Sequence, residues 1–538
     1  MRLKGTWLIS TAALVGALAP APAGAAAPLF STPVPIGGDA PPTGRGGPKA
    51  GGGGSPAQLK VSLGADGQAT VAWAGNPDSA ETSDVRVSER PPGGGDFSPP
   101  VTLAHERVGS LVIARNDAGV RAIAWPMKLF VAPPGAGFGA PQDVPVPPRA
   151  PVIHDYTEPT RSFLDTSVAV APNGSVLVGY EESDSNAGLQ RAVAVLRRPD
   201  GSWTEPQILD DDAGAPQVVA DAMGGLHALW ATAAHTTTDG LRLYVADAGP
   251  DGQFGPGRLV SNPDWRSDGH LSVNRRGDLL VDWVGQPSGP VIGASYRPAG
   301  GDWQQPEVLY GGIPYGGWSS GALDDRGNSA IAWTNGDAWA RSRPAGEGWG
   351  PVSSTFVRQG SLGPYRLAFE ANGRALLVSS AARSEGTIDT IVASILPRGG
   401  SLQLVTTVSS GVNPLSVPEL ATDAFGNGLI VWLRGPLNEP STVFASGYSA
   451  TPPDLTAVAA KRNAFAFKVN EPARVTVTVS GRHRSAMQWS RVPRGKNTLP
   501  FNGKVRSLLA RPGRYSATFR ARDAGPRASR TRTIKFKR

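Results

Sequence analysis

The sequence predicts an all-β protein: an eight-bladed β-propeller closed by an N-terminal strand and followed by a small β-sandwich. Three observations lead to this fold class. A motif such as DDRGNSAIAW (324–333) recurs eight times at intervals of 46 to 55 residues. The 68 Gly and 50 Pro residues of the 538-residue chain lie mostly between short apolar runs, which is typical of turn-dense β structure. Beyond the N-terminus, no long segment has helical periodicity.

Residues 1–25 are predicted to form a secretory signal peptide. Arg2 and Lys4 precede an apolar segment from about Trp7 to Ala19, and Ala23-Gly24-Ala25 offers a cleavage site. The apolar segment is too short to span a bilayer, and no later segment is long and apolar enough to do so. We therefore expect a secreted, extracellular protein. The chain has no Cys, which excludes disulfides and thiolate chemistry.

Each copy of the motif predicts a β-hairpin. A glycine supplies the positive φ that the tight turn needs, at Gly67, Gly119, Gly174, Gly224, Gly277, Gly327, Gly373 and Gly426. Asn or Asp stands three residues earlier in five copies, where its side chain is expected to bond the turn backbone. The residue six positions after the glycine is aromatic in seven copies and is expected to pack between blades: Trp73, Trp125, Tyr180, Trp230, Trp283, Trp333, Ser379 and Trp432. Because the copy with Ser379 is the weakest, seven blades are the alternative.

A second recurrent turn, as in RPAGGDWQQP (297–306), joins a third strand to a fourth, and four strands in about 51 residues are the content of a propeller blade. The last copy lacks its fourth strand. The segment FSTPVPI (30–36) resembles FSPPVTL (97–103), so we expect an N-terminal strand to complete the last blade and close the ring. The propeller is assigned to residues 29–451, with a flexible Gly/Pro-rich connection over 36–56.

Residues 452–538 differ in composition and are predicted to form a basic immunoglobulin-like β-sandwich. They contain 21 of the 52 Lys and Arg residues but only three of the 44 acidic ones. Alternation in ARVTVTVSG (473–481) indicates a strand with one apolar face. The stretch LLARPGRYSATFRARDAGPRASRTRTIKFKR (508–538) resembles the end of bacterial immunoglobulin-like modules, which implies a small β-sandwich. The excess charge favours adhesion to an anionic surface such as a cell-wall polymer, an acidic polysaccharide or lipid headgroups, with a merely solvated strand face as the alternative.

The repeat, written D-x-x-G-x-x-x-x-x-W followed by R-P-x-G-G-x-W, resembles that of secreted β-propeller repeat proteins of actinobacteria over about residues 57–450. This resemblance implies a fold and export, and it implies no activity. Sialidase-superfamily propellers are also similar, but their Asp-x-Gly box places an aromatic residue three positions after the glycine. Here the spacing is six, as from Gly327 to Trp333, so the resemblance implies a sialidase-like propeller without Asp-boxes.

Both recurrent turns must lie at one end of the ring, because the strands alternate in direction. The remaining connections, among them EESDSN (181–186), are expected to be irregular, and variable loops on a repeated scaffold are where recognition is usually found. Aromatic residues in these loops are candidate sugar-stacking platforms, although packing between blades is the competing explanation for each. The ligand-binding candidates are Asp155, Tyr156, Glu158, Arg161, Trp265, Asp268, His270, Tyr315 and Trp318.

These features favour an exported, non-enzymatic binding protein that recognises a carbohydrate or a cell-surface partner through its propeller loops. The alternatives are a sialidase-like glycoside hydrolase or a lyase with carboxylates in the same loops, and a structural surface protein. No catalytic residue, metal-ligand set or cofactor is assigned, and nucleic acid is not expected as a partner. GWSSG (317–321) matches the G-x-S-x-G motif of serine hydrolases, but no helix is predicted after Ser319, as a nucleophile elbow requires.

Overall fold

The computed structural model describes residues 29–40, 58–74, 83–106, 108–149, 161–185, 187–232, 242–261, 269–285, 291–311, 319–335, 337–355, 366–370, 372–384, 387–410, 417–434, 441–449, 453–471, 473–482, 484–492, 494–522, 529 and 531–538. Within these ranges one short helix, α1 (Gly503–Leu509), accompanies the strands, so the predicted all-β class is confirmed. No helix in this part of the chain is long and apolar enough to cross a membrane. The predicted signal peptide lies outside the described residues.

The described residues from 29 to 449 form eight antiparallel sheets, each built mainly from strands that follow one another in sequence. The first sheet contains β3 (Leu59–Leu63), β4 (Ala69–Trp73), β5 (Ser83–Arg90) and β6 (Val101–Glu106), and the second contains β7 (Val112–Arg115), β8 (Arg121–Trp125), β9 (Lys128–Ala132) and β10 (Gln142–Asp143). The third sheet contains β11 (Arg161–Val170), β12 (Val176–Asp184), β13 (Leu189–Arg197) and β14 (Gln207–Asp210), and the fourth contains β15 (Gln217–Ala220), β16 (Leu226–Ala231), β17 (Leu243–Ala248) and β18 (Arg258–Leu259).

The next three sheets repeat this plan, and the eighth adds strands from the N-terminus. The fifth sheet contains β19 (Gly269–Val273), β20 (Leu279–Gly285), β21 (Val291–Arg297) and β22 (Glu307–Gly311), and the sixth contains β23 (Ser319–Leu323), β24 (Ser329–Asn335), β25 (Asp337–Arg343) and β26 (Ser353–Thr355). The seventh sheet contains β27 (Arg366–Phe369), β28 (Ala375–Ser384), β29 (Thr387–Leu396) and β30 (Gln403–Ser410), and the eighth contains β31 (Glu419–Thr422), β32 (Asn427–Arg434) and β33 (Ser441–Ser449) together with β1 (Leu29–Phe30) and β2 (Val34–Ala40).

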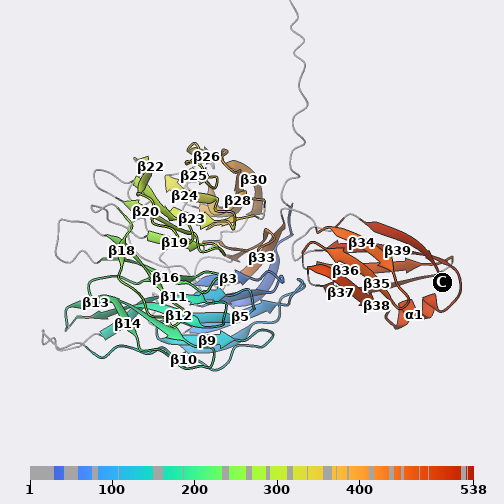
Figure 1. Ribbon diagram of the computed structural model, residues 1–538, viewed down its shortest axis with the longest axis horizontal. Helices are drawn as coiled ribbons and strands as arrows, with labels where there is room; N and C mark the ends of the chain where they lie inside the picture. The colour runs from blue at the N-terminus through green and yellow to red at the C-terminus, as the bar shows by residue number, and fades with distance from the viewer. Residues whose placement is uncertain are drawn as a thin grey trace, which may run out of the picture.

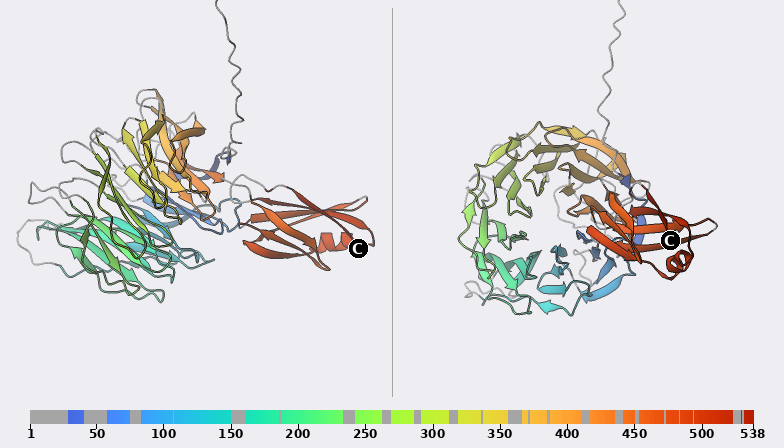
Figure 2. Two further views of the ribbon diagram at one scale, coloured as in Figure 1. Left: turned by 45° about the horizontal axis from the view of Figure 1, so that its top comes forward. Right: turned by 45° about the vertical axis from the view of Figure 1, so that its right-hand side comes forward.

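The eight sheets are arranged around a ring (Figures 1 and 2), and we call the described residues 29–449 the ring. The first strand of each sheet contacts the first strand of the next, and β3 of the first sheet contacts β31 of the eighth. All-β sheets of four strands in this arrangement agree with the predicted propeller class.

Strands β1 and β2 pair with β33 and so complete the eighth sheet. Phe30 lies opposite Tyr448, and Val34 lies opposite Ala445. The N-terminal segment therefore pairs with the last copy of the repeat, where the sequence predicted it. One boundary differs: β2 continues to Ala40, which pairs with Ser441, so the expected flexible connection does not begin at residue 36. The rest of that connection, from residue 41, lies outside the described residues.

The recurrent hairpins have the predicted turn chemistry. All eight turn glycines have positive φ, between 77° and 95°. In the sixth sheet, Asp324 Oδ1 accepts hydrogen bonds from the backbone N–H groups of Arg326 and Asn328, at 2.9 and 2.8 Å. Equivalent bonds form at the other four Asx positions: Asn116, Asp221, Asn274 and Asp423. We call the end of the ring that carries these turns the turn end, and the opposite end the loop end.

The aromatic positions of the repeat fill the space between neighbouring sheets. Trp333 is fully buried in one apolar cluster with Leu280 and Ile292 of the preceding sheet. The other residues at this position of the repeat are buried as well, including Ser379 at 4% exposure. Burial of a whole indole contributes several kcal/mol to the packing of two sheets, so the motif serves the scaffold.

Residues 453–538, here called the C-terminal unit, form two antiparallel sheets that share one apolar core. The three-stranded sheet contains β34 (Leu455–Ala460), β35 (Ala464–Val469) and β38 (Gly495–Pro500); the four-stranded sheet contains β37 (Ser485–Val492), β36 (Ala473–Ser480), β39 (Arg514–Arg522) and β40 (Arg532–Lys537). Val475, Val477 and Val479 are fully buried, as the alternation in sequence predicted. Strand β39 buries Tyr515 and Phe519 against the same core.

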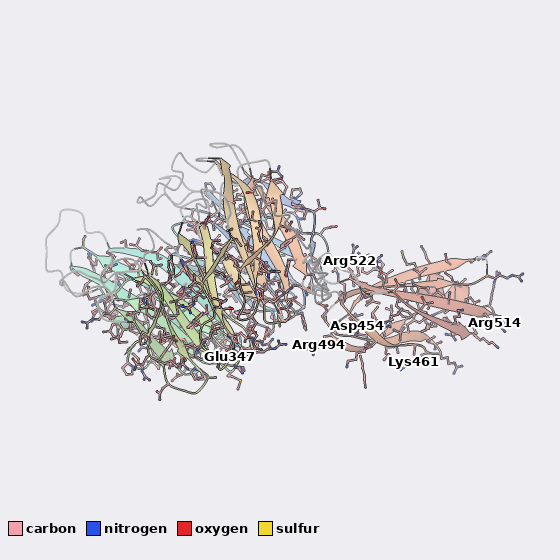
Figure 3. All side chains as sticks on the ribbon, turned by 90° about the horizontal axis from the view of Figure 1, so that it is seen from above. Glu347, Asp454, Lys461, Arg494, Arg514 and Arg522 are labelled. Atoms are coloured by element: carbon pink, nitrogen blue, oxygen red, sulfur yellow. The ribbon has the colours of Figure 1, made fainter. Side chains whose placement is uncertain are left out.

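The C-terminal unit packs on the turn end of the ring. Glu471, which is 2% exposed, accepts a hydrogen bond of 2.9 Å from Asn427 Nδ2, one residue after the turn glycine of the eighth sheet. The Arg494 guanidinium lies 5.7 Å from the ring centroid of Phe425 in the same turn. Figure 3 shows Arg494 and Arg522 on the side of the unit that faces the ring and Arg514 at its far tip. The loop end therefore lies on the opposite side of the ring.

Candidate functional site

The described part of the chain contains two of the nine predicted ligand-binding residues, Arg161 at the start of β11 and His270 in β19. Both lie at the loop end. They belong to the third and fifth sheets and contact different partners, so the structure does not bring these two side chains together. The other seven candidates lie outside the described residues: Asp155, Tyr156, Glu158, Trp265, Asp268, Tyr315 and Trp318.

Arg161 anchors a group of charged side chains at the loop end of the third sheet. Its Nε donates to Glu182 Oε1 at 2.8 Å, its Nη2 donates to the carbonyl of Pro147 at 2.7 Å, and its guanidinium lies 5.2 Å from the Phe163 ring centroid. The Glu182 side chain is fully buried. A buried carboxylate is tolerated only when it is paired, and Arg161 supplies that partner for Glu182 inside the sheet stack.

Two further arginines extend this group. Arg191 lies directly opposite Glu182 in the register of β12 and β13, 4.0 Å from its second oxygen, and donates to Asp211 at 2.7 Å. Arg149 Nε donates to Asp184 Oδ2 at 2.8 Å, and the Asp184 side chain is 1% exposed. The alternate residues Glu182 and Asp184 are thus both neutralised by arginines. We call the ion-paired set Arg149, Arg161, Glu182, Asp184, Arg191 and Asp211 the arginine–carboxylate frame.

Glu181 points to the opposite face of β12 and has a different environment. The pKa of its carboxyl is raised, mainly by burial and in smaller part by the charge of nearby Asp165. Hydrogen bonds from the Gln190 side chain and from the N–H of Ala215 oppose this rise. Asp165 is exposed and has φ of 24° at the bulge between Leu164 and Thr166. A residue other than glycine in that backbone region is strained, and such strain often occurs at functional sites.

The seam between the first and last sheets carries a second charged group at the loop end. Glu419 Oε1 lies 2.8 Å from Lys60 Nζ, and its two oxygens accept from Arg366 Nε and Nη2 at 2.8 and 2.7 Å. Burial on its own would raise the pKa of Glu419, but Lys60 and Arg366 overcome this effect and lower it to about 2. Glu419 is therefore ionised near neutral pH, and its ion pairs link three sheets.

His270 has a buried partner. Its Nδ1 lies 3.3 Å from Asp282 Oδ1, and Asp282 is fully buried in β20, where the other copies of the repeat have apolar or small residues. Asp282 Oδ2 has no hydrogen-bond partner among the described residues. A Cβ at Gly321 of the sixth sheet would overlap the Asp282 carboxylate. Gly321, the last residue of the GWSSG motif, therefore has a packing explanation.

Ser319 of the same motif lies in strand β23, opposite Trp333, with strand continuing on its C-terminal side. A nucleophile elbow requires a sharp turn from strand to helix at the serine, which β23 does not provide. The expectation that no helix follows Ser319 is therefore confirmed.

One sequence-based expectation about this end was wrong. Residues 181–186 were assigned to an irregular connection, whereas β12 continues through Asp184. The reason is electrostatic, since Glu182 and Asp184 alternate along one strand face and find arginine partners there. The signal was present in the sequence, because Arg191 stands on the predicted third strand at the right spacing for a cross-strand pair with Glu182.

Comparison with known proteins gives a likeness of fold at low identity. No protein-family model and no curated protein sequence matches the chain. Among solved structures, it is similar to the BP39L lectin from Burkholderia pseudomallei, at 11% identity over 66% of this chain and 100% of the lectin, with a TM-score of 0.42. It is also similar to an α-L-arabinanase of Penicillium chrysogenum complexed with arabinobiose, at 12% identity over 79% of this chain and 99% of that one, with a TM-score of 0.37. An ulvan lyase of a new polysaccharide lyase family is similar at 9% identity over 71% of this chain and 98% of that one, with a TM-score of 0.39.

Proposed function

We propose that this chain is an exported, non-enzymatic binding protein. In this proposal the eight sheets are the blades of a closed eight-bladed propeller over residues 29–451, and its loop end recognises a carbohydrate or a cell-surface partner. Residues 452–538 are an immunoglobulin-like β-sandwich that adheres to an anionic polymer of the cell envelope. The packing of the C-terminal unit on the turn end supports this division, because it leaves the loop end facing away.

The observation that carries the proposal is the ion pairing of the carboxylates at the loop end. Glu182 and Asp184 are buried, the Glu419 side chain is 12% exposed, and each of the three carboxylates is paired with at least one cationic side chain. Hydrolysis of a glycosidic bond needs one protonated carboxylic acid and one free carboxylate. A carboxyl whose pKa is held at about 2, as at Glu419, cannot serve as that acid near neutral pH. The arginines of these pairs suit binding, since Arg149 and Arg161 are still 39% and 20% exposed and can offer oriented donors to a ligand without proton transfer.

The test is a glycan array probed with the full chain and read for both retained protein and shortened glycan. We expect binding without cleavage. Replacement of two candidate aromatic residues, Trp265→Ala with Trp318→Ala, is expected to abolish binding, because stacking on an aromatic face contributes about 1–3 kcal/mol per ring in comparable sites. A charge change in the C-terminal unit, Lys468→Ser with Lys496→Ser, serves as the control. Absence of binding to every glycan would overturn the carbohydrate proposal and favour a structural surface protein.

A second candidate function is glycoside hydrolysis or lyase chemistry at the same end, and Glu181 is the observation that favours it. A carboxyl with a pKa raised by burial, close to a second carboxylate at Asp165, is the pairing that acid catalysis uses. If the loop end is catalytic, Glu181→Gln and Asp165→Asn each reduce release of shortened glycan by about 100-fold or more while the bound amount is retained. Unchanged release in both variants would exclude this pair.

A further inference from the structure

The outer face of the four-stranded sheet in the C-terminal unit is strongly cationic. Strands β36 and β39 bury alternate apolar residues, and the intervening residues point away from the core. The exposed basic side chains on this face are Arg474, Arg491, Arg514, Arg520, Arg522, Lys535 and Lys537. None of the four strands contains Asp or Glu. We call this surface the basic face.

The described acidic residues of the unit lie elsewhere and leave the basic face uncompensated. Asp454 lies 3.5 Å from Arg532, and Glu471 is buried against Asn427 of the ring. Within the sheet, Arg474 lies directly opposite Arg522, and Arg514 opposite Lys537. Like charges directly opposite one another destabilise a sheet. An arrangement that costs stability in the free protein points to an anionic ligand that relieves the repulsion.

An aromatic ring and a row of hydroxyl groups accompany these charges. Trp489 is 51% exposed even though the Arg474 guanidinium lies 4.1 Å from its ring centroid. Threonines alternate with the arginines, and together they line a hollow of about 460 Å³: Arg474, Thr476, Thr478, Thr518, Arg520, Arg522 and Thr531. An exposed indole offers a flat apolar surface to a pyranose ring, and a neighbouring guanidinium binds a carboxylate through two parallel hydrogen bonds.

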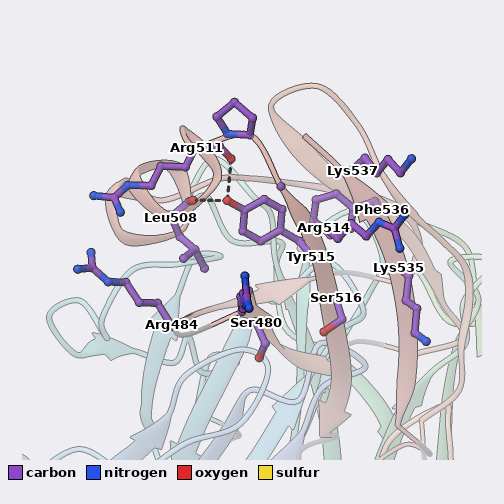
Figure 4. Close-up of a pocket in the computed structure, with 14 residues that line it drawn as sticks. Ser480, Arg484, Leu508, Arg511, Arg514, Tyr515, Ser516, Lys535, Phe536 and Lys537 are labelled. Atoms are coloured by element: carbon purple, nitrogen blue, oxygen red, sulfur yellow. Dashed lines mark hydrogen bonds between the residues drawn. The ribbon is translucent and has the colours of Figure 1, made fainter.

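A second hollow of about 1100 Å³ lies at the far tip of the same sheet (Figure 4). The Tyr515 ring stacks on Phe536 with centroids 6.0 Å apart, and the Tyr515 hydroxyl donates to the carbonyl oxygens of Arg511 and Leu508 at 2.7 and 3.0 Å. Basic side chains from β39, β40 and neighbouring turns surround these two rings. Strand β39 runs from one hollow to the other, because Arg514 at its start lines this hollow and Arg522 at its end lines the first one. A strand of nine residues places these two residues roughly 27 Å apart.

We propose that the basic face binds a linear acidic polysaccharide, a chain of sugar rings that carry carboxylates, along β39. The inference deepens the proposed adhesion of the C-terminal unit and rests on it. Guanidinium groups pair with the carboxylates, the Trp489 indole stacks on a sugar ring, and the threonine hydroxyls bond the sugar hydroxyls. A phosphate polymer without rings would have nothing to stack on the Trp489 indole. A single-stranded nucleic acid usually stacks its bases on several aromatic side chains, and this face has one exposed aromatic residue.

The experiment measures binding of the full chain to alginate, a linear uronate polymer, with neutral dextran, inorganic polyphosphate and a single-stranded oligonucleotide as comparison probes. We expect alginate binding that weakens about tenfold or more between about 50 mM and about 200 mM salt, because ion pairs release counterions. Arg520→Ser with Arg522→Ser is expected to weaken alginate binding about tenfold to thirtyfold. Lys468→Ser with Lys496→Ser removes the same charge from the other sheet and should change it less than about threefold. Unchanged melting temperatures verify that both double variants fold.

Trp489→Ala separates ring stacking from charge. It is expected to weaken alginate binding about fivefold or more and to leave polyphosphate binding unchanged, because polyphosphate has no ring to stack. Equal losses in the two double variants would overturn the basic face as the site, and tighter binding of the oligonucleotide or of dextran would overturn an acidic polysaccharide as its ligand. These outcomes are independent of ligand binding at the loop end of residues 29–449, because Trp265→Ala with Trp318→Ala should leave alginate binding intact. Alginate binding that is lost in this loop-end variant and kept in Arg520→Ser with Arg522→Ser would also overturn the inference.

Discussion

The Glu419 ion pairs at the seam of the ring make a pH-dependent contribution to stability. The carboxylate lies 2.8 Å from Lys60 Nζ and 2.7 Å from Arg366 Nη2, and its side chain is 12% exposed. Burial raises the pKa of this carboxyl, but the two cations outweigh burial and lower it to about 2 against an ordinary value of 4.5. The difference corresponds to about 3 kcal/mol of folding free energy at neutral pH.

The direction of the pH effect follows from the depressed pKa. The stabilisation is fully present above the unfolded-state pKa of 4.5 and is lost as the pH falls toward about 2. We therefore expect Glu419→Gln to lower the free energy of unfolding of the ring by about 3 kcal/mol at neutral pH. The difference from the wild-type chain should shrink with falling pH, because protonation removes the same charge from the wild-type carboxylate.

Urea denaturation followed by Trp fluorescence at several pH values measures this effect. Trp489 is the only Trp of the C-terminal unit, so the signal reports mainly on the ring. Glu347→Gln is the matched control, since Glu347 pairs with Arg398 at 3.4 Å and both side chains are more than half exposed. It should change the free energy of unfolding by less than about 0.5 kcal/mol. A Glu419→Gln deficit that is absent at neutral pH, or that does not shrink in acid, would refute the reasoning.

Three further substitutions test the scaffold. Trp333→Ala should destabilise the ring by about 3–5 kcal/mol in urea denaturation and leave binding specificity unchanged; altered specificity in a folded variant would contradict a purely structural role. Gly224→Ala should lower the free energy of unfolding by about 1–2 kcal/mol, because Gly224 has φ of 95° although there is open space around it. Gly348→Ala is the control, since Gly348 also has open space around it, and it should be nearly neutral. Equal effects of the two substitutions would argue against backbone strain. Gly321→Ala should cost about 1–3 kcal/mol in the wild-type chain and clearly less in the Asp282→Ala background, a coupling that a double-mutant cycle measures.

The scaffold could be predicted from the sequence because local chemistry determines it. A glycine with positive φ, an Asx residue three positions earlier and a buried aromatic residue six positions later specify a hairpin within about ten residues. Repetition then supplies the neighbours on which each hairpin packs. Even the closure was predictable, because the segment around Phe30 resembles the fourth strand that the last copy lacks.

The charged groups at the loop end could be predicted only where their partners are close in sequence. Glu182 and Arg191 lie on adjacent strands, so alternation and hairpin register together could have placed them opposite one another. Lys60 and Glu419 are separated by 359 residues and meet only because the ring closes. The overlap that a Cβ at Gly321 would make with Asp282 likewise depends on how two sheets stack, a distance that no single-strand pattern specifies.

The joint between the ring and the C-terminal unit uses the most constrained part of the repeat. Asp423 holds the last turn by accepting from the N–H groups of Phe425 and Asn427, each at 2.9 Å. The Asn427 amide then donates one hydrogen to Asp423 Oδ2 at 3.0 Å and the other to the buried Glu471 at 2.9 Å. Because an amide nitrogen has only these two donors, the contact with Glu471 inherits the geometry of the turn. This contact joins the C-terminal unit to the turn end, so the loops at the opposite end can vary in sequence without disturbing it.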